Sequence, residues 1–111
     1  MNARGPGACA GHPAGARFMT ASHEIICVDA LAIAMRDALA EYMLARSKFP
    51  RGFNSAHEGY AVLLEEVDEL KAHVWRKQSE RDYDAMRKEA IQVAAMAIAF
   101  IVEICDTENR T

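Results

Sequence analysis

The chain has 111 residues, a formal net charge of −3 at pH 7, and 51% hydrophobic residues. This length fits one domain, and the mildly acidic balance gives no general attraction to a nucleic acid polymer. With three prolines and few β-branched or aromatic runs, the composition favours an all-α fold.

The first 21 residues are rich in Gly, Ala and Pro and contain no apolar segment of the signal-peptide type. We interpret residues 1–21 as a flexible leader, followed by a helical domain over residues 22–106 and a short tail over residues 107–111. Apolar residues at intervals of three and four predict a first helix over residues 22–46. Pro50 and Gly52 then predict a loop over residues 47–54.

Ser55 followed by Glu58 has the spacing of a capping box, which predicts a second helix from residue 55 to about residue 77. Residues 79–82 can cap a third helix that continues to about residue 106, with a break near its middle. Residues 93–102 are continuously apolar, but this stretch is too short to span a membrane. Because the third helix is apolar nearly all round from Ile91, a single protomer would expose a large apolar surface. We therefore expect a homodimer, or a dimer of dimers, that completes a four-helix-type bundle.

The three cysteines are Cys9, Cys27 and Cys105. Their odd number and the lack of CxxC spacing indicate neither a zinc site nor a disulfide framework. We therefore expect reduced thiols in a cytoplasmic protein.

Acidic and amide side chains recur at helical spacing on the second and third predicted helices. Residues three or four apart lie on one face of a helix, so two antiparallel helices could bring these oxygens together. The residues concerned are Glu65, Glu66 and Glu69 on the second helix and Glu89 and Gln92 on the third. Carboxylate and amide oxygens suit Mg²⁺ or Mn²⁺, and Mg²⁺ binds substrate phosphates readily, so a nucleotide or another phosphate ester is the expected substrate. The alternative is that the acidic run is a solvated helix face, as most such runs are.

Residues 57–70 and 86–97 contain Glu65-Glu66-Val67-Asp68-Glu69 and Glu89-Ala90-Ile91-Gln92. Together they resemble the MazG-like all-α nucleoside triphosphate pyrophosphohydrolases, whose motif is EExxE followed, one helix later, by ExxD. The resemblance covers about residues 22–106 and implies a homo-oligomeric MazG-like helical bundle. It also implies that Glu66, Glu69 and Glu89 bind magnesium, and that Glu65 is a further ligand or orients the attacking water.

Gln92 stands where the family pattern has Asp. An amide oxygen can still bind Mg²⁺, but one negative charge is lost, so we expect weaker metal binding or a changed metal preference.

The function implied by this resemblance is Mg²⁺-dependent hydrolysis of a ribo- or deoxyribonucleoside triphosphate to the monophosphate and pyrophosphate. The biological role that it implies is nucleotide-pool house-cleaning. Cationic candidates for phosphate binding are Lys48, Arg51, Arg87 and Lys88. His73 follows Glu69 by four residues, and we leave it outside the ligand set. Two alternatives remain open: a catalytically silent helical oligomer that binds nucleotide or metal, which Gln92 keeps open, and a plain interaction module.

Overall fold

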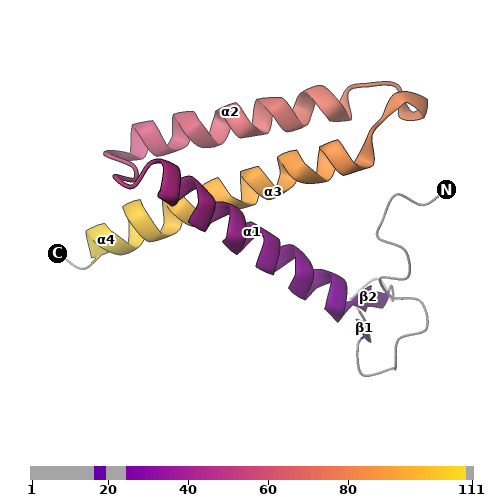
Figure 1. Cartoon of the computed structure of the whole chain (residues 1–111), viewed down its shortest axis with the longest axis horizontal. Helices are drawn as coiled ribbons and strands as arrows, with labels where there is room; N and C mark the ends of the chain where they lie inside the picture. The colour runs from indigo at the N-terminus through magenta and orange to yellow at the C-terminus, as the bar shows by residue number, and fades with distance from the viewer. Residues whose placement is uncertain (1–16, 20–24, 110–111) are drawn as a thin grey trace. The chain divides into compact units, whose positions relative to one another are not determined.

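The computed structural model describes residues 17–19 and 25–109 and divides the chain into two units, the first ending at Asp37 and the second beginning at Ala38. In the first unit, β1 (Arg17–Met19) and β2 (Ile25–Cys27) pair antiparallel, with Phe18 opposite Ile26. Helix α1 (Val28–Lys48) follows β2 and continues into the second unit (Figure 1).

The predicted start of the first helix at residue 22 is wrong. Ile25 and Ile26 belong to a strand, and the helix begins at Val28. Two adjacent β-branched residues favour the extended conformation, and this preference is stronger here than the apolar periodicity that suggested a helix. Strand β1 lies within the segment expected to be a leader, whose other residues fall outside the described part of the chain.

Helix α2 (Ala56–Val74) begins where the capping-box spacing predicted. The hydroxyl of Ser55 accepts a hydrogen bond from the backbone N–H of Glu58 at 3.1 Å, and the Glu58 carboxylate accepts one from the N–H of Asn54 at 2.5 Å. These bonds satisfy backbone donors that a helix start otherwise leaves unpaired. The start at Ser55 is therefore confirmed, while the helix ends three residues before the predicted end near residue 77.

A short 3-10 helix, η2 (Gln78–Glu80), leads into helix α3 (Tyr83–Phe100). The Asp82 carboxylate caps α3 by accepting hydrogen bonds from the N–H groups of Asp84 and Ala85, both at 3.1 Å. The helix continues through a π-helical segment, η3 (Ile101–Cys105), into α4 (Asp106–Asn109). The irregularity of the third helix therefore lies close to its end and not near its middle.

Helices α2 and α3 lie side by side and antiparallel, and the core of the second unit forms around α3 (Figure 1). Its buried members are Ala95, Met96 and Ala99, packed against Tyr42, Ala45, Phe53, Val62 and Leu63. Gly59 allows the close packing of α2, because a Cβ at this position would lie 2.8 Å from Cδ2 of Phe100 and 3.0 Å from Cδ2 of Phe53. The all-α fold class is thus confirmed for the described residues from Val28 onward.

The exposed apolar surface differs from the one expected. From Ile91 to Phe100, the large apolar side chains of α3 are buried or half-buried. Ile101 and Val102, which follow α3 in η3, are exposed. In the second unit, exposed apolar side chains also lie on α1, at Leu39, Met43 and Leu44, and on α2, at Tyr60. Self-association therefore stays a prediction, and the surface it would cover includes α1.

The cysteines also differ from expectation. Cys27 is disulfide-bonded, so the prediction of reduced thiols is wrong there, whereas Cys105 is free and exposed. Spacing alone does not reveal which cysteines a fold brings within bonding distance; Cys9 lies outside the described residues. No helix in the described part of the chain is long and apolar enough to cross a membrane, and the cytoplasmic location stays a prediction.

Candidate metal centre and adjoining pocket

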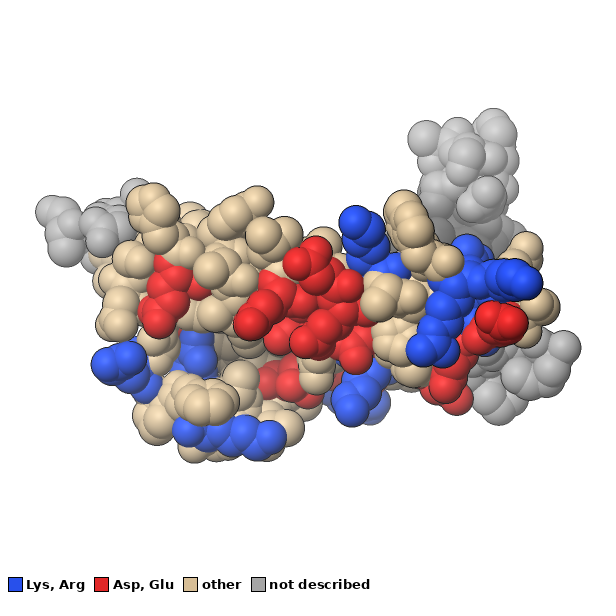
Figure 2. Space-filling view, turned by 90° about the horizontal axis from the view of Figure 1, so that it is seen from above, with Lys and Arg blue, Asp and Glu red and all other residues tan. Residues whose placement is uncertain are grey.

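Three carboxylates meet where α2 faces α3. Glu66 and Glu69 come from successive turns of α2, Glu89 comes from α3, and one carboxylate oxygen of each lies within 4.8 Å of those of the other two. The convergence predicted from helical spacing is therefore confirmed as geometry. Figure 2 shows acidic side chains gathered near the middle of the face seen from above α2.

Gln92 lies one helical turn beyond Glu89 and belongs to the same cluster. With its amide nitrogen turned toward the carboxylates, it donates hydrogen bonds to Oε1 of Glu66 at 3.0 Å and to Oε1 of Glu89 at 3.1 Å. Turning the amide by half a rotation would present its oxygen instead. Gln92 can thus hold two carboxylates together when no cation is bound, or offer a fourth oxygen when one is.

The electrostatics of the cluster favour a cation. Burial raises the pKa of the half-buried Glu66, and the negative charges of Glu69, Glu89 and Glu65 raise it further. Neighbouring carboxylates disfavour one another's ionised form, and a positive charge between them offsets this repulsion. Three carboxylates and one amide are oxygen donors of the type that Mg²⁺ and Mn²⁺ prefer, so the residues present fit a hard divalent cation.

His73 lies beside Glu89. Its Nε2 is 4.0 Å from Oε2 of Glu89, and its buried Nδ1 has no hydrogen-bond partner among the described residues. His73, which lies outside the predicted ligand set, is placed against the cluster as a neighbour of one carboxylate.

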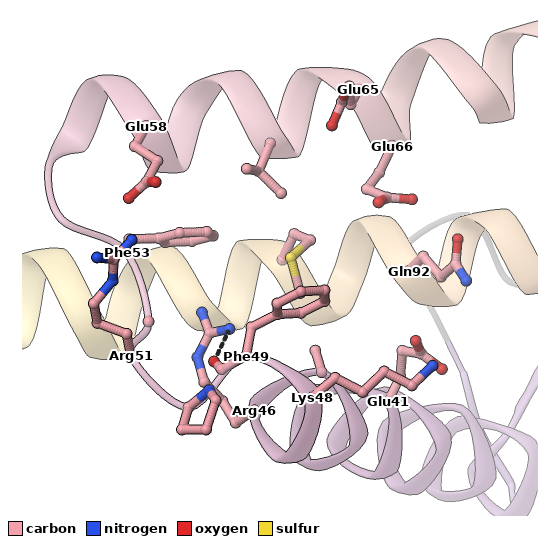
Figure 3. Close-up of a pocket in the computed structure, with 15 residues that line it drawn as sticks. Glu41, Arg46, Lys48, Phe49, Arg51, Phe53, Glu58, Glu65, Glu66 and Gln92 are labelled. Atoms are coloured by element: carbon pink, nitrogen blue, oxygen red, sulfur yellow. Dashed lines mark hydrogen bonds between the residues drawn. The ribbon is translucent and has the colours of Figure 1, made fainter.

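An open pocket of about 660 Å³ adjoins the cluster within the second unit. It is lined by Glu41, Arg46 and Lys48 of α1, residues 49–53 of the following loop, Glu65 and Glu66 of α2, and Gln92 and Met96 of α3, among others. In Figure 3, Glu66 and Gln92 lie near one end, Lys48 and Glu41 reach toward that end from α1, and Arg51 lies at the other end near Glu58. The ring of Phe49 lies between the two ends. The pocket thus combines an acidic end, three cationic side chains and an apolar middle.

The structure separates the predicted phosphate-binding residues into two groups. Lys48 and Arg51 line the pocket, whereas Arg87 and Lys88 are exposed on α3 and are not among the lining residues. Among the aromatic residues, Phe53 lines the pocket, while Trp75 is 75% exposed and does not. Glu65 also lines the pocket and is exposed, so water can reach its carboxylate.

One polar network beside the pocket was not predicted. Glu103 of η3 accepts hydrogen bonds from Nε and Nη2 of Arg46 at 2.5 and 2.6 Å, from the Tyr42 hydroxyl at 2.8 Å, and from the N–H of Phe53 at 3.0 Å. Burial alone would raise the pKa of Glu103, but the hydrogen bonds from Arg46, Tyr42 and Phe53 outweigh burial and hold that pKa below its ordinary value. A sequence signal was available, because an acidic residue in an otherwise apolar helix needs a buried partner. The partner itself, 57 residues away, was not predictable from spacing.

Comparison with known proteins gives no relative: no protein-family model, curated protein or solved structure matches this chain.

Proposed function

We propose that this chain is a MazG-like, Mg²⁺-dependent nucleoside triphosphate pyrophosphohydrolase, which converts a ribo- or deoxyribonucleoside triphosphate to the monophosphate and pyrophosphate. The observation that carries the proposal is the convergence of Glu66, Glu69, Glu89 and Gln92 from two antiparallel helices. A pocket with cationic and apolar walls adjoins these four residues, as a substrate with a triphosphate and a base requires.

The acidic residues would hold Mg²⁺, or Mn²⁺, which when bound supplies positive charge to the triphosphate and polarises its phosphoryl groups. Lys48 would contact phosphate oxygens, since it lines the pocket, reaches toward its acidic end and carries the charge that phosphate needs. Arg51 also lines the pocket but lies at the other end, away from the acidic cluster. Arg87 and Lys88 have no part in the site of a single protomer in this proposal.

Glu65 would act as the general base. Its exposed carboxylate lines the pocket and can take a proton from water as the water oxygen bonds to the α-phosphorus. The bond between the α-phosphorus and the oxygen that bridges to the β-phosphorus breaks, and pyrophosphate leaves with that oxygen.

The apolar part of the pocket would receive the nucleoside. Phe49 is 70% exposed and, with Phe53, presents aromatic rings to the pocket. Flat aromatic side chains are suitable surfaces for a planar base. Self-association through exposed apolar residues of α1 and η3, with Leu39, Met43 and Ile101 among them, belongs to the same proposal.

A second candidate is a scaffold that binds nucleotide or metal without turnover. It is favoured by Gln92, whose amide nitrogen, when turned toward the carboxylates, donates to Glu66 and Glu89 and so partly satisfies the cluster without an ion. In this case the fourth ligand charge needed for catalysis would be missing.

Pyrophosphate release from a panel of canonical and modified nucleoside triphosphates, with Mg²⁺ and with Mn²⁺, tests the proposal. We expect release with an equal amount of monophosphate in the wild type and none in Glu66→Ala. Asp68→Ala is the matched control, because Asp68 is an exposed acidic residue on the same helix that does not line the pocket. The absence of release with every nucleotide and metal would refute the enzyme and favour the silent scaffold.

A further inference from the structure

The loop between α1 and α2 forms one wall of the pocket. Phe49, Pro50, Arg51, Gly52 and Phe53 are successive residues, and all of them line it. At its two ends the loop is tied to the neighbouring helices, by the hydrogen bond from the N–H of Phe49 to the carbonyl of Ala45 at 2.8 Å and by the bond between Asn54 and Glu58. Between these ends, the N–H of Phe53 donates to Oε1 of Glu103. The wall is therefore also held, at Phe53, by a residue that is distant in sequence.

Arg46 contacts the same loop. Its guanidinium lies over the ring of Phe53, 5.1 Å from the ring centre, and Nη1 donates to the carbonyl of Phe49 at 3.5 Å. The other edge of the guanidinium, Nε and Nη2, forms a bidentate ion pair with the Glu103 carboxylate. Glu103 therefore holds the loop directly through Phe53 and indirectly through the orientation of Arg46.

The close approach of the loop to Glu103 depends on Gly52. Its φ of 77° lies in the left-handed region that glycine adopts at little cost, and a Cβ there would lie 3.0 Å from Oε1 of Glu103. The loop is thus shaped to pass directly beside this carboxylate.

The half-buried ion pair of Arg46 and Glu103 is a weak source of stability, because withdrawing both charges from water offsets much of their attraction. Such a pair instead fixes the orientation of its two side chains, because the planar guanidinium donates two parallel hydrogen bonds to a carboxylate in one arrangement. Glu103 is also presented by a π-helical segment, a feature that is frequent at functional sites.

We propose that Glu103 is a positioning residue that, through Arg46 and the N–H of Phe53, holds the 49–53 wall in the shape that receives the base-bearing part of the ligand. That the ligand is a nucleoside triphosphate rests on the proposed function; that the wall is ordered by Glu103 does not. Glu103 belongs to neither the acidic cluster nor the pocket lining, so its loss should disturb the wall while leaving metal binding unchanged.

The test uses Glu103→Gln, which keeps the size of the side chain and removes its charge, and Arg46→Lys, which keeps the charge and removes the fork. Arg36→Lys is the control, because Arg36 forms an exposed ion pair with its neighbour Asp37. Without ligand, we expect hydrogen exchange at the Phe53 amide and trypsin cleavage after Arg51 to accelerate by about tenfold in both variants, the factor corresponding to a charge-assisted hydrogen bond. The amide of Met96 in the core should exchange as in the wild type. The double variant should be no worse than either single one, since the two residues act as a unit.

Turnover supplies the second readout. Loss of wall order should raise KM for the nucleotide about fivefold or more while kcat changes less than about twofold, as expected when uniform binding is removed. Unchanged exchange at Phe53 and an unchanged KM in folded variants would overturn the proposal, even if the melting temperature fell. If Glu103→Gln does not fold, Tyr42→Phe removes one of the four hydrogen bonds and should give a smaller acceleration at Phe53; no acceleration there would also overturn it. If the wild type shows no turnover, the proposed function fails, and the exchange measurements alone decide whether Glu103 orders the wall.

Discussion

Replacing Gln92 with Asp should make the metal-free protein less stable and its response to Mg²⁺ stronger. Without a cation, the substitution removes an amide whose nitrogen, turned toward the carboxylates, donates to Glu66 and Glu89 at 3.0 and 3.1 Å, and it puts a fourth negative charge in its place. With a cation bound, the same charge adds to the attraction between the site and the ion.

The size of the effect follows from the geometry. Two unit charges about 4 Å apart interact by about 1 kcal/mol in water and about 4 kcal/mol at an effective dielectric constant near 20. Glu66 and Glu89 are half-buried and the pocket is open, so the lower part of this range applies to each pair. Together with the lost hydrogen bonds, each worth about 1 kcal/mol, we expect the free energy of unfolding of metal-free Gln92→Asp to fall by roughly 2–4 kcal/mol.

Urea unfolding in the presence of a chelator and in excess Mg²⁺ measures both parts of this prediction. Gln92→Asn is the matched control, because Asn has the size of Asp without the charge. Relative to Asn, Asp should lower stability in chelator and should bind Mg²⁺ about tenfold more tightly, which adds about 1.4 kcal/mol at saturation. Equal stability of Asp and Asn in chelator, with no stronger response to Mg²⁺, would mean that residue 92 does not face the cluster.

Three further predictions concern the site and its scaffold. Glu69→Gln should abolish Mg²⁺-dependent pyrophosphate release while circular dichroism and sedimentation show unchanged helicity and oligomeric state; undiminished release would remove Glu69 from the site. Gly59→Ala should lower the free energy of unfolding by about 1 kcal/mol, because crowding against Phe100 and Phe53 at about 1–3 kcal/mol outweighs a helix-propensity gain of about 1 kcal/mol, so equal or greater stability in urea would contradict the packing described here. The pKa of Glu103 lies below its usual value of 4.5 in the folded state, so its contribution to stability is present above about pH 4.5 and is lost as the pH falls through the lowered pKa. Acid unfolding of the wild type should therefore be steeper in that window than that of Glu103→Gln, and parallel curves would contradict the assigned hydrogen bonds.

The acidic cluster was predictable because its geometry is local. Spacings of three and four residues fix which side chains share a helix face, and two antiparallel helices bring such faces together whatever surrounds them. Helical spacing and antiparallel packing were sufficient to predict the convergence of Glu66, Glu69, Glu89 and Gln92.

The pocket wall and the network around Glu103 were not predictable by the same reasoning. The pairing of Arg46 with Glu103 depends on how the end of α1 packs against η3, and no periodicity reports contacts over 57 residues. The placement of Lys48 and Arg51 in the pocket, and of Arg87 and Lys88 outside it, likewise depends on tertiary packing. At the start of α1, the preference of Ile25 and Ile26 for the extended conformation competed with apolar periodicity, and a sequence pattern does not measure which of the two prevails.

A crystal structure with Mn²⁺, recorded where manganese scatters anomalously, shows whether Glu66, Glu69 and Glu89 together hold a divalent cation. We expect an anomalous peak bounded by these three carboxylates in the wild type and its loss in Glu69→Gln. A wild-type structure with excess Mn²⁺ and no peak at the cluster would contradict this expectation.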